Sequence, residues 1–302
     1  MPPAPTLLIR QFLNQIQPRL LPFLGWRRQL DAATLRKDLL AGLTVALVAV
    51  PQALAYAQLA GLPAYVGLYA SLLPSIVGAL WGSSAQLNTG PVALTSLLTA
   101  SALSSLALPG SDTWLLLAVQ LALLAGVLQV AFGALRLAHF ADLLSHPVLH
   151  GFINACSLLI CVAQLPTLLG LPSAGQRPFF EAVVDLARGL PDIHLPSAAL
   201  GTAAIALLVA QRRFLPRWPG VLIAVVGLGA AAWLTGFEAD GGRVVGALPE
   251  QILAFALPRA DWGQTTDLLP SAFVLALVSF IEAMSSCKLA SARTGQRWDG
   301  NQ

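Results

Sequence analysis

The chain has 302 residues, of which 56% are hydrophobic and only 10% are charged. Soluble domains carry about 25% charged residues, so this composition excludes an ordinary soluble domain and predicts an integral membrane protein. The formal net charge of +3 is small, and no basic stripe with interleaved aromatic residues accompanies it, which excludes nucleic acid as a partner. We therefore expect the lipid bilayer to surround most of the chain.

Residues 1–38 are rich in proline and in basic side chains and contain no apolar stretch of the length of a signal peptide. We interpret them as a cytoplasmic N-terminal tail, with a short interfacial helix near residues 9–16. Residues 39–302 then form the membrane domain.

Long apolar runs follow the tail, and about 20 apolar residues are enough for a helix to cross a bilayer. We expect eight membrane segments, at residues 39–62, 64–81, 91–106, 114–135, 147–169, 196–210, 220–237 and 268–290. The third is short enough to be a half-length helix. Pro51 is expected to break the first segment in its middle. Residues 179–190 place apolar and charged side chains at helical spacing, which predicts an amphipathic surface helix.

The basic residues decide the orientation of these segments. With the N-terminus inside, 13 of the 17 lysine and arginine residues lie on the inner side. The four on the outer side are Arg177, Arg188, Arg243 and Arg259. Because positive charge favours cytoplasmic loops, the N-terminus is predicted to be cytoplasmic in a multi-pass protein of the cell membrane. This count requires the third segment to cross the membrane, since otherwise Arg212, Arg213 and Arg217 would lie on the outer side.

A polar island, Ser83–Ser96, interrupts the apolar runs with Gln86, Asn88, Thr89 and Gly90. Irregular backbone at membrane depth is tolerated only where it is buried in protein or lines a wet cavity. Proline suits the first turn of a helix, so we expect a helix to begin at Pro91. Such a helix directs free N–H groups at a central site, which suits an anion.

Glu282 is the only acid expected inside the hydrocarbon. A charged acid at the bilayer centre costs at least ~2.5 kcal/mol, which makes this residue a functional candidate. Burial favours the neutral form of a carboxyl group, so Glu282 is a candidate for taking up a proton while an anion moves. The alternative is a residue near the helix end that pairs structurally or reaches toward the interface.

Three polar side chains near these features have two interpretations each. Gln52 and Tyr56 share a helical face after Pro51 and could donate hydrogen bonds to a substrate oxygen, or could join neighbouring helices. Ser286, beside Ser285 and one turn from Glu282, could line the site or serve only in packing.

No cofactor or metal is expected. His146 and His150 are four residues apart, but Pro147 lies between them and no third ligand is evident. His139, His146 and Asp142 suit a wet cytoplasmic entrance instead. No nucleophile elbow, phosphate loop or zinc-protease helix is present, so no enzyme is expected.

Four stretches resemble the SulP family of sulfate permeases and anion transporters. The first is DLLAGLTVALVAVPQALAYAQLAGLPAYVGLYASLLPSIVGALWGSSAQLNTGPVAL, residues 38–94. The others are LSHPVLHGFINACSLLI (144–160), VVGALPEQILAFALP (244–258) and FIEAMSSCKLASARTGQRWDGNQ (280–302). The motif EAMSSCKLA is more similar to plant-type members than to bicarbonate transporters, in which an aspartate-based sodium site is expected.

The resemblance implies an all-α, UraA-like transporter fold of two inverted seven-segment repeats, divided into core and gate. This chain would supply the first repeat, about 39–237, and one further span. The third and tenth segments are half-helices that meet at the anion, with short extended pieces before them. The resemblance also implies a homodimer, a C-terminal STAS domain and an elevator-like movement of the core.

The family's functional positions map onto residues named above. The resemblance places Gln52 and Tyr56 at anion-contacting positions of the first span. It places the start of the third segment against the anion through the backbone of Thr89, Gly90, Pro91, Val92 and Ala93. Glu282 matches the acid associated with proton coupling.

The function implied is secondary active transport of an inorganic anion, with sulfate favoured and proton symport as the coupling. Transport or exchange of bicarbonate, chloride or a dicarboxylate is the alternative within the family. The sequence stops where the family continues into a ninth segment, so we expect an N-terminal portion of a longer protein or a truncated product. A membrane fragment or regulatory subunit without transport is therefore the alternative of another class.

Overall fold

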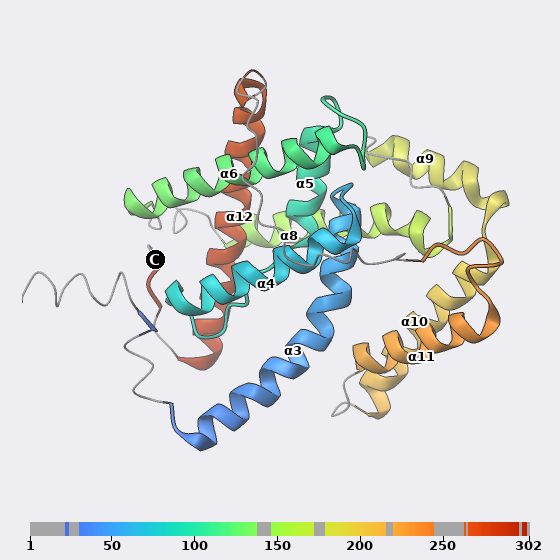
Figure 1. The fold of residues 1–302 in the computed structure, drawn as a ribbon, viewed down its shortest axis with the longest axis horizontal. Helices are drawn as coiled ribbons and strands as arrows, with labels where there is room; N and C mark the ends of the chain where they lie inside the picture. Colours follow the sequence, from blue (N-terminus) through green and yellow to red (C-terminus); the bar gives the residue numbers. More distant parts are fainter. Residues whose placement is uncertain are drawn as a thin grey trace, which may run out of the picture.

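A computed structural model describes residues 22–23, 30–137, 146–171, 179–215, 220–244, 263, 265–295 and 298–300. The described residues are mostly helical and contain no β-strand. The elements are α3 (Ala32–Leu59), α4 (Ala64–Trp81), α5 (Ala93–Leu103), α6 (Asp112–Ala134), α8 (His146–Leu168), α9 (Phe179–Gly189), the 3-10 helix η2 (Leu190–Asp192), α10 (Leu195–Phe214), α11 (Gly220–Thr235) and α12 (Thr265–Thr294) (Figure 1).

Five of these helices, α3, α4, α6, α10 and α12, are long and apolar enough to cross a membrane. Helices α5 and α11 and the stretch Ser157–Leu168 of α8 are shorter apolar helices. Many large apolar side chains on the long helices are exposed, such as Leu39 at 71% and Val130 at 74%. A surface of this kind suits lipid and not water. The chain is a multi-pass membrane protein, as predicted.

The first helix differs from its prediction at two points. It begins at Ala32, seven residues earlier than expected, because Asp31 caps it through a 2.7 Å hydrogen bond from the Thr34 backbone N–H. Hydrogen bonds from the Thr34 side chain and backbone hold the pKa of Asp31 below its usual value. The helix also continues through Pro51. The expected break is wrong, and α3 is one of the membrane helices that contain a proline within their length. The predicted interfacial helix at residues 9–16 lies outside the described residues.

The helices form two groups (Figure 1). Helices α3, α4, α5, α6 and α12 pack together, chiefly through the pairs α3–α4 and α6–α12. Helices α10 and α11 pack against each other, and α8 contacts α5 on one side and α9 and α10 on the other. Helix α9 has one apolar and one charged face, with Phe180 81% exposed, as its sequence predicts.

The buried core of the larger group lies where α5, α6 and α12 meet. Its fully buried large side chains are Trp114 and Leu121 of α6, Leu103 of α5 and Leu268 of α12. The indole Nε1 of Trp114 donates a 3.0 Å hydrogen bond to the carbonyl oxygen of Ala60, which ties α6 to the end of α3. Small buried residues, among them Ala272, let α12 approach closely, as is common between membrane helices.

The contact between α3 and α4 depends on a glycine. A Cβ atom added to Gly67 would collide with the backbone carbonyl group of Ala53. Ala53 and Ala57 are the buried residues of α3, so the two backbones meet through small side chains only.

We predict that Gly67→Ala separates α3 from α4 and lowers the stability of the folded protein by about 1–3 kcal/mol, the usual cost of overpacking. Thermal unfolding of the purified protein in detergent measures it as a lower midpoint. Gly126→Ala is the matched control, because a Cβ at Gly126 meets nothing within 4 Å. Equal midpoints for the two variants would contradict the prediction.

Candidate anion site

The polar island forms an extended segment that leads into α5. Residues 82–92 are not helical, and Val92, with φ −127° and ψ 144°, caps the helix that begins at Ala93. The expectation that the helix starts at Pro91 is therefore wrong by two residues. The fixed φ of proline also suits extended backbone, and here Pro91 belongs to the extended segment.

Helix α5 is a half-length helix that begins inside the protein. Its 11 residues span about 16 Å, half of a ~30 Å bilayer core. No side chain caps its start, in contrast to α3 and α6, which Asp31 and Ser111 cap. The N–H groups of Ala93, Leu94 and Thr95 thus have no acceptor within the helix or in a cap.

The residues at the start of α5 are buried, so water does not readily satisfy these N–H groups. Ala93, Leu94 and Ser96 are buried, and a buried N–H group needs an acceptor. The partial positive charge of a helix start adds to the attraction for a negative ligand. The start of α5 is therefore chemically suited to an anion.

Helix α4 holds the extended segment in place. The Ser75 hydroxyl donates to the carbonyl oxygen of Thr89 at 2.7 Å and lies 3.2 Å from Oδ1 of Asn88. One turn later, Gly78 leaves room for the Thr89 side chain, since a Cβ at this glycine would collide with the Thr89 hydroxyl. Neither residue is predictable from the sequence, because serine and glycine in an apolar helix carry no signal of a partner more than ten residues away.

The end of α12 holds the other end of the segment. The Ser83 hydroxyl donates to the carbonyl oxygen of Asp299 at 2.7 Å and accepts from the Asp299 N–H at 3.1 Å. The side chain of Cys287 of α12 lies against that of Ser84. The ring of Trp298 packs on Met284, which brings the chain after α12 back against the helix. We call these contacts the Ser83 clip.

Glu282 lies close to the depth at which α5 begins. Leu103, at the end of α5, and Leu268, near the start of α12, share one buried cluster, so these two antiparallel helices extend from it to the same side (Figure 1). With a rise of about 1.5 Å per residue, the start of α5 lies about 15 Å from Leu103. The same distance along α12 ends about ten residues after Leu268. Glu282 follows one turn later, and the contact between Cys287 and Ser84 fixes the same depth from the other end.

The remaining predicted residues lie on α3 and α12, two helices that pack against α5. The amide nitrogen of Gln52 donates to the Tyr56 hydroxyl at 2.6 Å, so the two side chains form one polar unit on α3, which packs against α5. The Ser285 hydroxyl donates to Ile281 within its own helix, while Ser286 is exposed. Glu282 is half-buried and has no hydrogen-bond or ion-pair partner among the described residues.

The residues considered for a metal lie mostly beyond the described part. His139 and Asp142 are outside the described residues, and so are the side chains of His146 and His150. Within the described part of the chain, no cluster of three or more histidine, cysteine, aspartate or glutamate side chains could hold a metal ion.

Comparison with solved structures defines the class of the fold. The chain superposes on the structure of SLC26A9 with a TM-score of 0.82 and 23% identity, covering 96% of this chain and 49% of that one. The transmembrane domain of a cyanobacterial bicarbonate transporter, BicA, gives a TM-score of 0.74 at 25% identity, covering 90% and 70%. The chain has a UraA-like transporter fold, made of the first repeat and one further span.

Sequence comparison gives the family. The model of the sulfate permease family matches residues 35–302. A probable sulfate transporter of Mycobacterium tuberculosis (strain CDC 1551 / Oshkosh) is 36% identical over 274 residues, covering 91% of this chain and 49% of its own. The chloroplastic sulfate transporter 4.1 of Arabidopsis thaliana is 34% identical, covering 87% and 39%. The chain belongs to the sulfate permease family and spans about half the length of these relatives.

We predict that Ser75→Ala loosens the extended segment. Loss of its hydrogen bonds removes about 1–2 kcal/mol, so amides of residues 86–96 should exchange with deuterium about tenfold faster. Ser71→Ala is the matched control, since the Ser71 hydroxyl bonds only to Leu68 of its own helix. Unchanged exchange in Ser75→Ala would show that α4 does not hold the segment.

Proposed function

We propose that this chain carries half of the substrate site of a secondary active transporter for an inorganic anion, with sulfate as the substrate. The observation that carries the proposal is the buried, uncapped start of α5 at the end of an extended segment. The family membership and the names of the relatives support the choice of sulfate.

The proposed substrate contacts combine backbone and neutral side-chain donors. The backbone from Thr89 to Ala93, including Gly90, Pro91 and Val92, faces the anion, and the N–H groups at the start of α5 hold it. Gln52 and Tyr56 donate from α3, and Ser286 lines the site from α12. Neutral donors and a helix start bind a divalent oxyanion without forming an ion pair that would be hard to break.

We assign the proton-coupling step to Glu282. An anion that enters a cell works against the membrane potential, at about 2.3 kcal/mol per charge per 100 mV. A proton on Glu282 reduces the charge that crosses with each sulfate. The half-buried position of this carboxyl group near the depth of the α5 start, without a partner among the described residues, supports this role.

The division into two helix groups supports an elevator mechanism. Helices α3–α6 and α12 carry the proposed site and would move together as the core. Helices α10 and α11 would belong to the gate, with α8 and the contact between α3 and α11 at the boundary. We further propose a homodimer in the cell membrane with a cytoplasmic N-terminus, an orientation supported by the distribution of basic residues.

Bicarbonate is the second candidate substrate. The fold comparison with the bicarbonate transporter BicA favours it, and backbone donors recognise charge and shape without a diagnostic side chain. Competition by bicarbonate in a sulfate-binding experiment separates the two.

Ala93→Pro tests the anion site directly. Proline is well suited to the first helical position and removes only the N–H group, and Val92 is already extended as a residue before proline must be. We predict about tenfold weaker sulfate binding, because a hydrogen bond to a charged group contributes about 1.5–3 kcal/mol. Sulfate titration read out as deuterium-exchange protection of α5 measures it.

Ala32→Pro is the matched control for this variant. It makes the same change at the first position of α3, after an extended Asp31, far from the proposed site. Equal sulfate protection of α5 in Ala93→Pro and in the unsubstituted protein would refute the anion site.

Glu282→Gln tests the coupling separately. In proteoliposomes, we expect sulfate uptake driven by external acid to fall by at least tenfold, while sulfate–sulfate exchange persists. Glu238→Gln, in the turn after α11, removes a carboxylate elsewhere and should leave both fluxes unchanged. Uptake that stays fully driven by acid in Glu282→Gln rejects the coupling role.

The same proteoliposome assay tests whether the 302-residue chain can transport by itself. Because the relatives are about twice as long, fluxes are compared for the 302-residue chain and for a fusion of it to the C-terminal half of a relative. Flux from both proteins, or from the fusion alone, allows the coupling test. No flux and no binding from either protein would favour a membrane subunit without transport.

A further inference from the structure

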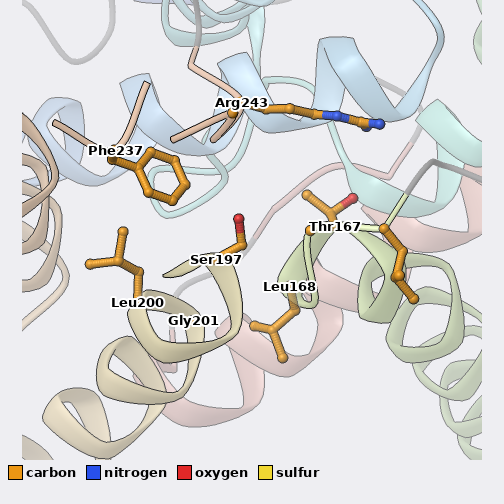
Figure 2. A pocket seen from close by; sticks show the side chains of 10 residues that line it. Thr167, Leu168, Ser197, Leu200, Gly201, Phe237 and Arg243 are labelled. Carbon is orange, nitrogen blue, oxygen red and sulfur yellow. The ribbon is translucent and has the colours of Figure 1, made fainter. Parts of the chain in front are cut away.

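A small cavity lies in the second helix group, away from α5 and α12. It has a volume of about 170 Å³ and is enclosed by the end of α8, the start of α10 and the turn after α11. Leucine side chains and Phe237 make it apolar on one side, while Thr167, Ser197 and Arg243 supply polar groups. In Figure 2, the two hydroxyl groups point toward the side of the cavity along which Arg243 extends.

His194, just before α10, joins the three elements around this cavity. Its backbone N–H donates to the Leu169 carbonyl oxygen at 3.1 Å, and Gly170, at φ +69°, leaves room for its side chain. The ring Nε2 lies 2.9 Å from the carbonyl oxygen of Asp240, and Nδ1 lies 2.8 Å from the Ser197 hydroxyl. The ring also contacts Phe237 edge-on.

These partners determine where the hydrogen atoms lie. A carbonyl oxygen only accepts, so Nε2 of His194 carries the hydrogen that it donates to Asp240. In a neutral ring Nδ1 is then the acceptor, and the Ser197 hydroxyl donates to it. In this state Ser197 offers the cavity only oxygen lone pairs, which repel an anion.

A proton on His194 reverses the role of Ser197. Both ring nitrogens of a protonated histidine are donors, so Nδ1–H donates to the Ser197 oxygen. The hydroxyl hydrogen of Ser197 is then free to turn into the cavity beside Thr167 and Arg243. Histidine is the side chain whose ordinary protonation change falls between about pH 5 and 8.

We propose that this cavity binds a tetrahedral oxyanion of the sulfate or phosphate type, and that binding takes up a proton on His194. Arg243 supplies the positive charge, and Thr167 and Ser197 supply hydrogen-bond donors. Sulfate or phosphate occupies well under 170 Å³, so the volume admits it. The site is separate from the proposed transport site, which lies in the other helix group.

The charges on the neighbouring elements support a link between anion and proton. Asp192 precedes His194, Glu238 and Asp240 lie in the turn after α11 with Arg243, and the end of α8 from 167 to 171 has no charged residue. An oxyanion beside Arg243 accepts the hydroxyl hydrogen of Ser197 only when that hydrogen is turned into the cavity. A proton on His194 frees this hydrogen, so anion and proton favour each other's binding.

The oxyanion has two sources. With the orientation that the basic residues predict, the cavity is on the outer face, open to free ions. It also lies next to amphipathic α9, which packs against α8; a Cβ atom added to Gly189 at the end of α9 would meet Leu171, which lines the cavity. An amphipathic helix of this kind lies at the level of lipid head groups, so a lipid phosphate can reach it.

The protonation of His194 is the readout that tests the proposal. The chain has four histidines, and in ¹⁵N-histidine-labelled protein the variant His194→Gln identifies the signals of this ring. We measure the midpoint pH of its protonation in phospholipid-free detergent, with sulfate or with chloride at equal ionic strength. If the protonated form binds sulfate about tenfold more tightly, saturating sulfate raises the midpoint by about one pH unit.

Two arginine variants provide the controls. Arg243→Gln should abolish the rise, whereas Arg188→Gln, on α9 and not among the cavity residues, should keep it. In nanodiscs without sulfate, a higher midpoint in phosphatidylglycerol than in phosphatidylcholine assigns the oxyanion to an anionic lipid phosphate. A rise with sulfate alone assigns it to the free ion.

Two results would overturn the proposal: no rise with either ligand, or an equal rise in Arg243→Gln. Ala93→Pro and Glu282→Gln leave the midpoint unchanged if the two sites are independent. Failure of the proposed transport function therefore does not alter this measurement.

Discussion

A buried N–H group without an acceptor costs about 1–3 kcal/mol, and the start of α5 lies among buried residues without a side-chain cap. Much of the surrounding structure positions this helix start. Ser75 and Gly78 of α4 hold the extended segment before it, the Ser83 clip fastens the far end, and the cluster around Leu103 fixes the helix itself. A side-chain cap would satisfy these N–H groups, and α5 has none. A bound anion would satisfy them instead.

The two helix groups use polar residues in contrasting ways. In the larger group, hydroxyl groups bind the backbone of a non-helical segment and leave its helix start open. In the second group, one histidine ring gathers three elements around a cavity with an arginine at its rim. In our proposals, the first arrangement attracts an anion through a helix start alone, whereas the second depends on a proton that His194 takes up with the anion. A protein with both can respond to anions and protons at separate places.

Sequence patterns predicted most of the fold, because membrane helices are recognisable in a sequence as long apolar runs. The bounds of α4 were predicted to the residue, and the half-length of α5 followed from Ser83–Ser96 and the charge count. The errors at Pro51 and at the start of α3 came from treating proline and charge as stop signals, which packing and an aspartate cap override. The error at Pro91 came from treating proline as the first residue of a helix, whereas it belongs to the extended segment. Ser75, Gly78 and His194 were beyond prediction, because their importance lies in partners distant along the chain.

The Ser83 clip joins residues 216 positions apart, Ser83 and Asp299. Contacts of such long range are made only after the intervening helices exist, so they slow folding and come last. During synthesis, Ser83 cannot make its contacts with Asp299 until α12 has been inserted. The segment that would bind the substrate is thus among the last parts of the chain to complete its tertiary contacts.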